Sequence, residues 1–221
     1  NNVITVEDPV EKKIDGVNQC QINEKTGMTF ASGLMAILRQ DPDIIGVGEI
    51  RDSETAAIAA RAAITGHLVL STLHTNDSIS AVHRLMDIGV EPYMISSALK
   101  GVISQRLVRK ICPHCKASYK PSDEEKLLFG LSETEDIQLY RGEGCPECHH
   151  SGYSGRQAVF EILTLTKKMR NMISEDASEE QLAKEAAAGD FTPMREACKK
   201  LVLEGVTTVE EALKAINSTA E

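Results

Sequence analysis

Residues 41–52, which read DPDIIGVGEIRD, decide the fold class of this chain. The segment begins with a turn around Pro42, continues into the apolar run Ile44–Val47 and reaches an acidic residue at Glu49. A short apolar run between turn residues is typical of a strand that is buried on both faces of a parallel sheet. The alanine-rich segment 52–65 follows and predicts a helix that covers this strand. The sequence therefore indicates an α/β fold.

The same pattern continues on both sides of this segment. Short apolar or β-branched runs at 3–6 and 68–72 predict two further buried strands, and helical spacing predicts helices over 30–40 and 78–88. Strands that alternate with helices form a mainly parallel sheet with helices on its faces. In such sheets, ligands bind at the carboxyl ends of the strands. Because polar residues follow each strand, we expect the three polar clusters to converge on one site.

Composition and motifs divide the chain into three parts. Residues 1–107 carry the alternation of strands and helices, 108–155 contain four cysteines, and 156–221 begin with a short strand and continue as helices. We expect that short strand, at 158–163, to rejoin the main sheet. Candidate N-cap residues predict that four helices begin near Thr166, Ser178, Thr192 and Thr207.

The composition limits the class of function. The chain has 221 residues and a net charge of −9, with 24 Lys and Arg against 33 Asp and Glu. An acidic chain with 4% aromatic residues and no tryptophan is a poor candidate for nucleic-acid binding, which needs basic and stacking side chains. No apolar run approaches the roughly 20 residues that a membrane-spanning helix requires. The first residues read as a strand without an initiator methionine, which predicts a piece of a longer protein.

Two acids that follow predicted strands are candidates for chemistry on a nucleotide. Glu49 can bind Mg²⁺ through a water ligand or polarise an attacking water, since Mg²⁺ keeps several of its waters in proteins. The alternative for Glu49 is an acid at the end of a core strand that is solvated or caps the next helix. Glu7 can orient and deprotonate water as a general base. The alternative for Glu7 is a turn in which Asp8 caps and Pro9 sets the bend.

Two histidines bracket the predicted strand at 68–72. His67 precedes this strand and His74 follows it. An imidazole near a γ-phosphate can sense that group by hydrogen bonding. A lone histidine beside a strand is otherwise a structural residue, so both interpretations stay open.

Two C-x-x-C pairs, Cys112 with Cys115 and Cys145 with Cys148, predict a metal site. Four thiolates around a tetrahedral centre select Zn²⁺, and a site closed by four thiolates is structural. The alternatives are a redox dithiol and four free thiols. The cysteines at positions 20 and 198 read as buried thiols outside this site.

Three segments together resemble the motifs of one family. Residues 6–11 (VEDPVE) resemble its aspartate box, 39–52 resemble its Walker B segment, and 65–77 (TGHLVLSTLHTND) resemble its histidine box. Over nearly its whole length the chain is similar to the secretion ATPases of the type II secretion and type IV pilus assembly family. The resemblance implies a RecA-like P-loop NTPase core, an inserted tetracysteine zinc lobe and a C-terminal helical subdomain. It also implies ATP, Mg²⁺ and Zn²⁺ as cofactors and a homo-hexamer as the working assembly.

The matching positions imply roles for single residues. Glu7 is implied to be the catalytic base and Glu49 the acid of the Mg²⁺ site, with His67 and His74 on the phosphate side. Asp8 belongs to the same implied nucleotide site. The arginines implied to bridge the nucleotide and a neighbouring subunit are Arg39, Arg51 and Arg61, since an arginine fork pairs with phosphate bidentately.

One motif of that family is missing from these residues. The phosphate loop G-x-x-x-x-G-K-[ST], which should precede the aspartate box, does not occur in the chain. Without its backbone N–H groups and lysine, the β- and γ-phosphates lose their main cradle. We therefore expect this chain alone to hydrolyse ATP poorly or not at all.

The resemblance also implies a cellular setting. The tetracysteine unit favours the assembly and secretion branch of the family over the retraction ATPases, which generally lack it. The implied protein is a cytoplasmic motor, peripheral to the bacterial inner membrane. Its implied partners are an inner-membrane platform protein and cytoplasmic docking proteins, with no nucleic acid. Two alternatives stay open: a non-catalytic, zinc-bearing docking relative, which the missing loop favours, and a RecA-like motor that acts on nucleic acid.

Overall fold

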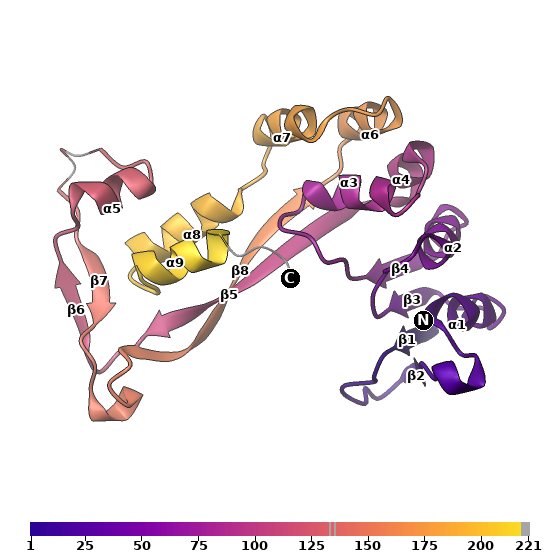
Figure 1. Ribbon diagram of the computed structural model, residues 1–221, viewed down its shortest axis with the longest axis horizontal. Helices are drawn as coiled ribbons and strands as arrows, with labels where there is room; N and C mark the ends of the chain where they lie inside the picture. Colours follow the sequence, from indigo (N-terminus) through magenta and orange to yellow (C-terminus); the bar gives the residue numbers. More distant parts are fainter. Residues whose placement is uncertain (133, 135, 218–221) are drawn as a thin grey trace.

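The computed structural model describes residues 1–132, 134 and 136–217. Figure 1 shows an elongated arrangement. The amino-terminal α/β unit lies at one end, a long two-stranded ribbon runs through the middle, and the cysteine-containing lobe lies at the other end. The predicted α/β class is confirmed.

A parallel sheet forms the centre of the amino-terminal unit. Its strand order is β2-β1-β3-β4, and each neighbouring pair is parallel. The strands are β1 (Val3–Glu7), β2 (Val17–Gln21), β3 (Ile44–Val47) and β4 (Leu68–Ser71). Val47 lies beside Val6 on one side and Ser71 on the other, so β1, β3 and β4 end at the same edge of the sheet.

Helices cover this sheet, and side-chain caps fix where the first two begin. The Thr29 hydroxyl caps α1 (Phe30–Ile37), and the Asp52 carboxylate caps α2 (Ser53–Ile64) by accepting the Thr55 N–H at 2.8 Å. The other helices of this unit are η1 (Glu24–Thr26), α3 (Ser80–Asp87) and α4 (Pro92–Ala98). The core of the sheet includes Val6, Leu34, Ile45, Val47 and Ala59.

Two features of the sheet differ from the predictions. β4 is not buried, since Leu68 and Leu70 are 51% and 56% exposed. The reason is that β4 is an end strand, which pairs with β3 alone among the described residues. β2 is absent from the predictions because its sequence, VNQCQ, is mostly polar. Backbone pairing with β1 holds β2 in the sheet without an apolar pattern that the sequence could reveal.

A long antiparallel ribbon connects the two ends of the molecule. β5 (Gly101–Ile111) pairs with β8 (Tyr153–Thr164), and Ile103 lies opposite Ile162. The strand predicted at 158–163 exists within β8, but the prediction that it rejoins the main sheet is wrong. In the described chain β8 pairs with β5 instead. The two boundaries between the predicted parts, at 107–108 and 155–156, fall within β5 and β8.

The lobe at the far end contains a short antiparallel pair, β6 (Lys116–Tyr119) and β7 (Leu139–Gly142). Between them in sequence lies α5 (Asp123–Leu128), which Ser122 and Glu125 begin with a capping box. A 3₁₀ turn, η2 (Pro146–Cys148), forms the second cysteine knuckle. The lobe is therefore small and has little regular structure to stabilise it.

The carboxyl-terminal helices pack in two pairs. They are α6 (Lys167–Ser174), α7 (Glu179–Ala187), α8 (Met194–Leu203) and α9 (Val209–Asn217), and each begins within two residues of the predicted start. Residues from α6 and α7 join the core of α3 and α4. Residues from α8 and α9 pack against the ribbon and the cysteine lobe. None of the helices in the described ranges is long and apolar enough to span a bilayer.

An ion pair between a buried glutamate and a half-exposed arginine joins α9 to the ribbon. Glu211 is 7% exposed, and its carboxylate accepts the Arg109 guanidinium at 2.6 Å and the Arg109 backbone N–H at 3.2 Å. The Arg109 guanidinium also lies over the Tyr153 ring, 4.0 Å from its centroid. The hydrogen bond from the Arg109 side chain lowers the pKa of Glu211 to about 2, from an ordinary value of 4.5. Glu211 is therefore ionised at neutral pH.

We expect Glu211→Gln to lower the free energy of unfolding by about 2 kcal/mol at neutral pH, because Arg109 then loses its counter-ion. The loss is smaller than for a fully buried pair, since Arg109 is half exposed. The pKa of Glu211 is lower in the folded chain than in the unfolded one, so its stabilisation is present above pH 4.5 and disappears as the pH falls toward about 2. Urea unfolding across this range measures both effects. Glu210→Gln is the control, since Glu210 is exposed; equal pH profiles for wild type and Glu211→Gln would contradict the prediction.

Candidate functional site

The carboxyl ends of β3 and β4 bring three of the predicted residues together. Glu49 follows β3, and its Oε1 lies 2.6 Å from Arg51 Nη2. Its Oε2 lies 3.3 Å from Nε2 of His74, which follows β4. The strand register brings these residues together. Val47 and Ser71 are paired, so the segments that follow β3 and β4 leave the sheet at the same edge.

Backbone and hydroxyl contacts hold these strand ends against one another. Thr72 Oγ1 donates to the Gly48 carbonyl at 2.7 Å, and the Ile50 N–H donates to the Thr72 carbonyl at 3.1 Å. The Gly48 N–H donates to the Val6 carbonyl at 2.8 Å. A Cβ atom at Gly48 would lie 3.3 Å from that carbonyl oxygen, so glycine permits the close approach. Hydrogen bonds of Gly48 and Ile50 thus fix the backbone on both sides of Glu49.

The surroundings of Glu49 keep it ionised. The hydrogen bond from Arg51 is the largest cause that lowers the pKa of Glu49, and His74 lowers it further against the opposing effect of burial. Glu49 in turn raises the pKa of Arg51, and the charge of Asp8 adds to this effect. Glu49, Arg51 and His74 therefore act on one another at this edge, and Asp8 acts on Arg51. An ionised carboxylate in such a place can hold a hydrated divalent cation.

Glu7 ends β1 at the same edge, but its side chain is bound from the side of β2. Its Oε1 accepts hydrogen bonds from Thr5 Oγ1 and from Gln19 Nε2, the latter at 2.9 Å. Gln19 also donates to the Lys12 carbonyl at 3.0 Å and accepts the Ile14 N–H at 2.8 Å. Gln19 is a functional candidate that the sequence analysis missed. A glutamine within a polar strand gives no pattern that could have revealed it.

Three other predicted residues lie where strands begin. His67 precedes β4, and its Nδ1 lies 3.0 Å from the Ala62 carbonyl oxygen in α2. Arg61 is in the last turn of α2, and Arg39 follows α1 on the way into β3. The family resemblance implies roles for these three residues at the nucleotide or between subunits, but they do not lie with Glu49 in this chain. The structure separates them from Glu49 because the beginnings and ends of parallel strands lie at opposite edges of a sheet.

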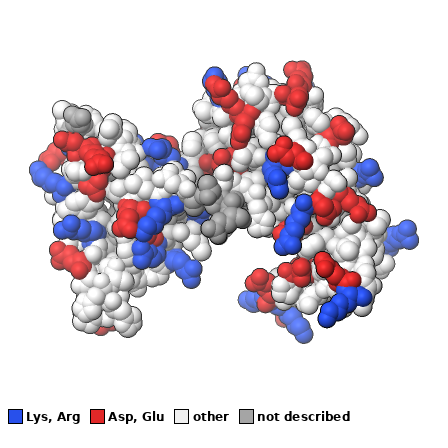
Figure 2. Space-filling view, in the orientation of Figure 1, with Lys and Arg blue, Asp and Glu red and all other residues white. Residues whose placement is uncertain are grey.

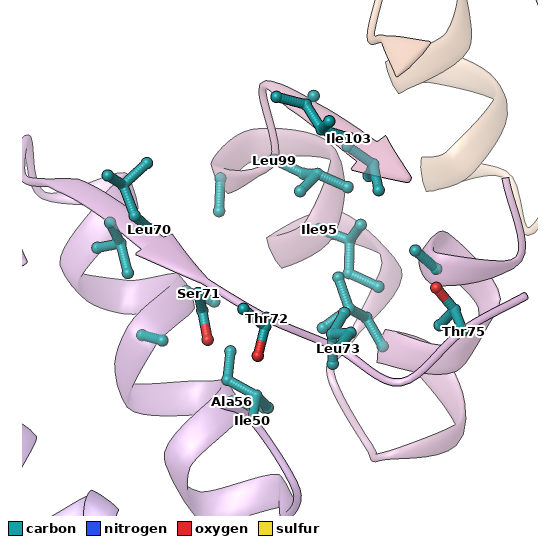
Figure 3. Close-up of a pocket in the computed structure, with 18 of the residues that line it drawn as sticks. Ile50, Ala56, Leu70, Ser71, Thr72, Leu73, Thr75, Ile95, Leu99 and Ile103 are labelled. Carbon is teal, nitrogen blue, oxygen red and sulfur yellow. The ribbon is translucent and has the colours of Figure 1, made fainter. Parts of the chain in front are cut away.

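An apolar cavity of about 460 Å³ lies beside the same strand end, between β4, α2, α4 and β5. Figure 3 shows Ile95 and Leu99 around this space, with Ser71 at the end of β4 and Thr72 directly after it. Aliphatic side chains dominate its lining, and Arg106 is the one charged residue among the described residues that line it. Such walls do not suit a phosphate. The charged site around Glu49 is therefore the better candidate for nucleotide chemistry.

The four predicted metal ligands meet in one cluster. The Sγ atoms of Cys112, Cys115, Cys145 and Cys148 all lie within 4.8 Å of one another. The distances Cys112–Cys145 and Cys115–Cys148 are 3.9 Å, and Cys145–Cys148 is 3.7 Å. Zinc–sulfur bonds of about 2.3 Å around a tetrahedral centre place the sulfur atoms about 3.8 Å apart. The donor set therefore fits a tetrahedral Zn²⁺ ion.

Backbone N–H groups point at two of these sulfur atoms. Gly144 donates to Cys115 Sγ, while Cys145 and Gly152 donate to Cys148 Sγ, each at 3.3 Å. The N–H of Cys145 is the largest cause that lowers the pKa of the Cys148 thiol to about 6, whereas burial outweighs the Gly144 donor and raises the pKa of the Cys115 thiol. Donors of this kind stabilise a thiolate, which is the form that binds a metal.

The surface charge is mixed on the face that Figure 2 shows. Lys and Arg side chains are interspersed with Asp and Glu over both ends of the molecule. The net charge of −9 is thus not gathered into one acidic region on this face. Strong electrostatic interactions on this chain are therefore short-range contacts between charged side chains, as between Glu49 and Arg51.

Comparisons with known proteins agree on one group of proteins. The family model described as "Type II/IV secretion system protein" matches residues 1–214. Type II secretion system protein E of Pseudomonas aeruginosa is 49% identical over 213 residues, which are 96% of this chain and 42% of that protein. The type IV pilus assembly ATPase PilB of Thermus thermophilus is 51% identical over 214 residues, which are 96% of this chain and 24% of that protein.

Solved structures share the fold of this chain. The pilus retraction motor PilT with bound ADP matches with a TM-score of 0.71 and 32% identity, over 98% of this chain and 53% of that one. The ATPase DotB of Legionella pneumophila matches with a TM-score of 0.66 and 21% identity, over 97% of this chain and 51% of that one, and shows a shared fold. The chain spans about half the length of these structures and less than half of the two curated relatives.

Proposed function

Because this chain belongs to the type II/IV secretion system protein family, we propose that it forms part of an ATPase that powers type II secretion or type IV pilus assembly. The names of its curated relatives support this activity. The single observation that carries the proposal is the ionised Glu49 at the end of β3, in contact with Arg51 and His74. An acid in this position is what a nucleotide-associated Mg²⁺ requires.

Each polar residue at the site has a part in the proposed hydrolysis. Glu49 would hold a hydrated Mg²⁺, which would neutralise charge on the phosphates, and Asp8 adds negative charge on the same side of the sheet. Glu7 orients the attacking water and accepts its proton at a carboxylate oxygen. Arg51 has a planar fork that can pair with phosphate oxygens. His74 donates a hydrogen bond to the terminal phosphate.

The working assembly in this proposal is a homo-hexamer. Arg39 and Arg61 are exposed where strands begin, away from Glu49, and are therefore available to a neighbouring subunit. His67 lies at the same edge and holds the end of α2. The proposed role of Arg39 and Arg61 is to bridge subunits, which allows one subunit to respond to the nucleotide of the next.

The cysteine cluster is proposed to hold one structural Zn²⁺. All four ligands are thiolates, so the site is closed and contributes stability to the lobe, with no open position for catalysis. The lobe projects from the far end of the ribbon (Figure 1). This position favours contact with an inner-membrane platform protein or a cytoplasmic docking protein. The proposed location is cytoplasmic and peripheral to the bacterial inner membrane.

ATP hydrolysis by this chain tests the proposal directly. We expect its turnover alone to be at least about 100-fold slower than that of a version extended at the amino end by the phosphate-loop segment of a relative such as PilB, because that loop supplies the donors for the phosphates. Phosphate release at saturating ATP measures both rates, and substitution of the loop lysine by alanine is the control. If the extended protein binds ATP but does not hydrolyse it, the alternative function, a zinc-bearing docking protein, is favoured.

A further inference from the structure

Glu161, in β8, is a buried carboxylate outside the nucleotide site. It is 5% exposed. Its Oε1 accepts the Ser78 N–H at 2.9 Å and the Ser78 hydroxyl at 2.6 Å, and its Oε2 accepts the Met194 N–H at 2.8 Å. A buried acid is costly unless such donors satisfy it. Glu161 therefore joins two segments that are remote from each other in sequence.

The contact with Met194 caps a helix. α8 begins at Met194, and its N-cap residue, Pro193, makes no side-chain capping bond. The first N–H groups of a helix need an acceptor from elsewhere when the N-cap residue supplies none. Glu161 supplies it from β8, with a carboxylate oxygen at the positive end of the helix dipole. The start of α8 thus depends on the ribbon.

The contact with Ser78 holds the loop that carries His74. This loop, residues 72–79, leaves β4 and leads into α3. Its first part is tied to the candidate nucleotide site by the contacts of Thr72 with Gly48 and of His74 with Glu49. Its last part is tied to Glu161 through Ser78, which is 0% exposed. The loop is therefore held between the nucleotide site and the ribbon, which lies between α3 and α8 in Figure 1.

We propose that Glu161 is a positioning residue that couples the loop bearing His74 to α8. Ser78 and Met194 bind the same carboxylate, so a displacement at Ser78 changes the bond that begins α8. α8 shares a core with Phe129 and Leu139 of the cysteine lobe, which extends the connection to the far end of the molecule. The link to hydrolysis rests on the proposed function, in which His74 contacts the terminal phosphate. The link between the loop and α8 does not depend on it.

Amide hydrogen exchange in this chain tests the coupling without any nucleotide. Ser78→Ala removes a donor from Glu161, and we expect exchange in the first turn of α8, residues 194–197, to become at least about threefold faster. Ser80→Ala is the matched control, because the Ser80 hydroxyl contacts Asp77. We expect it to leave exchange in α8 unchanged within about 1.5-fold. Unchanged exchange in α8 after Ser78→Ala overturns the proposal.

Glu161→Gln completes a double-mutant cycle. The amide cannot accept hydrogen bonds on both sides, so we expect exchange in 194–197 to rise at least about tenfold, and Ser78→Ala to add nothing in that background. A full additional effect of Ser78→Ala in the Glu161→Gln background overturns the coupling. Protected amides in β1 and β3 report that both variants remain folded.

A kinetic experiment tests the link to hydrolysis separately. In a version extended by a phosphate loop that hydrolyses ATP, we expect Glu161→Gln to lower kcat about tenfold with less than about a twofold change in KM, because the residue acts through the loop and does not bind ATP. An unchanged kcat overturns this link. An extended wild-type protein without turnover would instead count against the proposed function, so the two failures are distinguishable.

Discussion

Replacing Cys112 with serine is expected to remove the zinc from this chain and to unfold the cysteine lobe before the parallel sheet. Three thiolates leave a tetrahedral structural site incomplete. The sheet has a core of its own, which includes Leu34 and Ile45, whereas Phe129 and Leu139 of the lobe belong to a separate core. Structural zinc binding contributes about 10–16 kcal/mol in small zinc domains.

Metal content and tyrosine fluorescence measure this outcome. Two of the four tyrosines, Tyr119 and Tyr140, lie on β6 and β7, so the emission reports on the lobe when Tyr93 and Tyr153 are replaced by phenylalanine in both proteins. We expect the fluorescence transition of the variant to fall well below the transition of the sheet followed by circular dichroism. Cys20→Ser is the matched control, since Cys20 lies in β2, outside the cluster. Full zinc content in the Cys112→Ser protein would refute the proposed ligation.

Local signals explain why much of the fold could be predicted from the sequence. The apolar run Ile44–Val47 is bounded by turn residues, and the strand β3 has those limits. Asp52 caps α2 because a short acidic side chain satisfies the first N–H groups of a helix. The four cysteines carry their own spacing signal, and their sulfur atoms do meet. In each case the decisive interaction lies within a few residues or within one repeated motif.

Non-local pairing explains the errors. The segment 158–163 forms a strand, but the sequence carries no mark that directs it to β5 in preference to the sheet. The exposure of β4 depends on its place at the end of the strand order, which no property of LVLS reveals. Glu161 reads as one acid among many, and its role depends on Ser78, 83 residues away. The candidate residues around Glu49 have signals in the sequence, whereas the contacts between their side chains depend on the register of the strands.

Glu49→Gln is expected to lower kcat for ATP by about 10²–10³ in a version extended by a phosphate loop, with nucleotide affinity changed by less than about twofold. Glutamine keeps the size of the side chain but removes the charge that the hydrated Mg²⁺ needs. It also removes the counter-ion of Arg51 and the partner of His74. Because Arg51 and His74 lower the pKa of Glu49, its carboxylate is ionised near neutral pH, and the variant removes one negative charge from the site.

Steady-state phosphate release and equilibrium binding of a fluorescent ATP analogue separate the effects on kcat and on affinity. Glu54→Gln is the matched control, because Glu54 is an exposed acid in the first turn of α2, five positions along the chain. We expect it to retain the activity of the parent within about twofold, as surface substitutions usually do. Wild-type turnover in the Glu49→Gln protein would rule out its assigned role.

Magnesium titration then separates the two acids at this edge of the sheet. Glu49 is proposed to hold the hydrated cation, so its removal should raise the Mg²⁺ concentration that half-saturates the remaining turnover by at least about tenfold. Glu7 is proposed to act on the attacking water, so Glu7→Gln should reduce kcat about as strongly while leaving that concentration unchanged. Glu7 accepts hydrogen bonds from Thr5 in β1 and from Gln19 in β2, whereas Glu49 contacts Arg51 and His74. Equal Mg²⁺ dependence in the two variants would mean that both carboxylates serve the cation, and Glu7 would lose its role as the base.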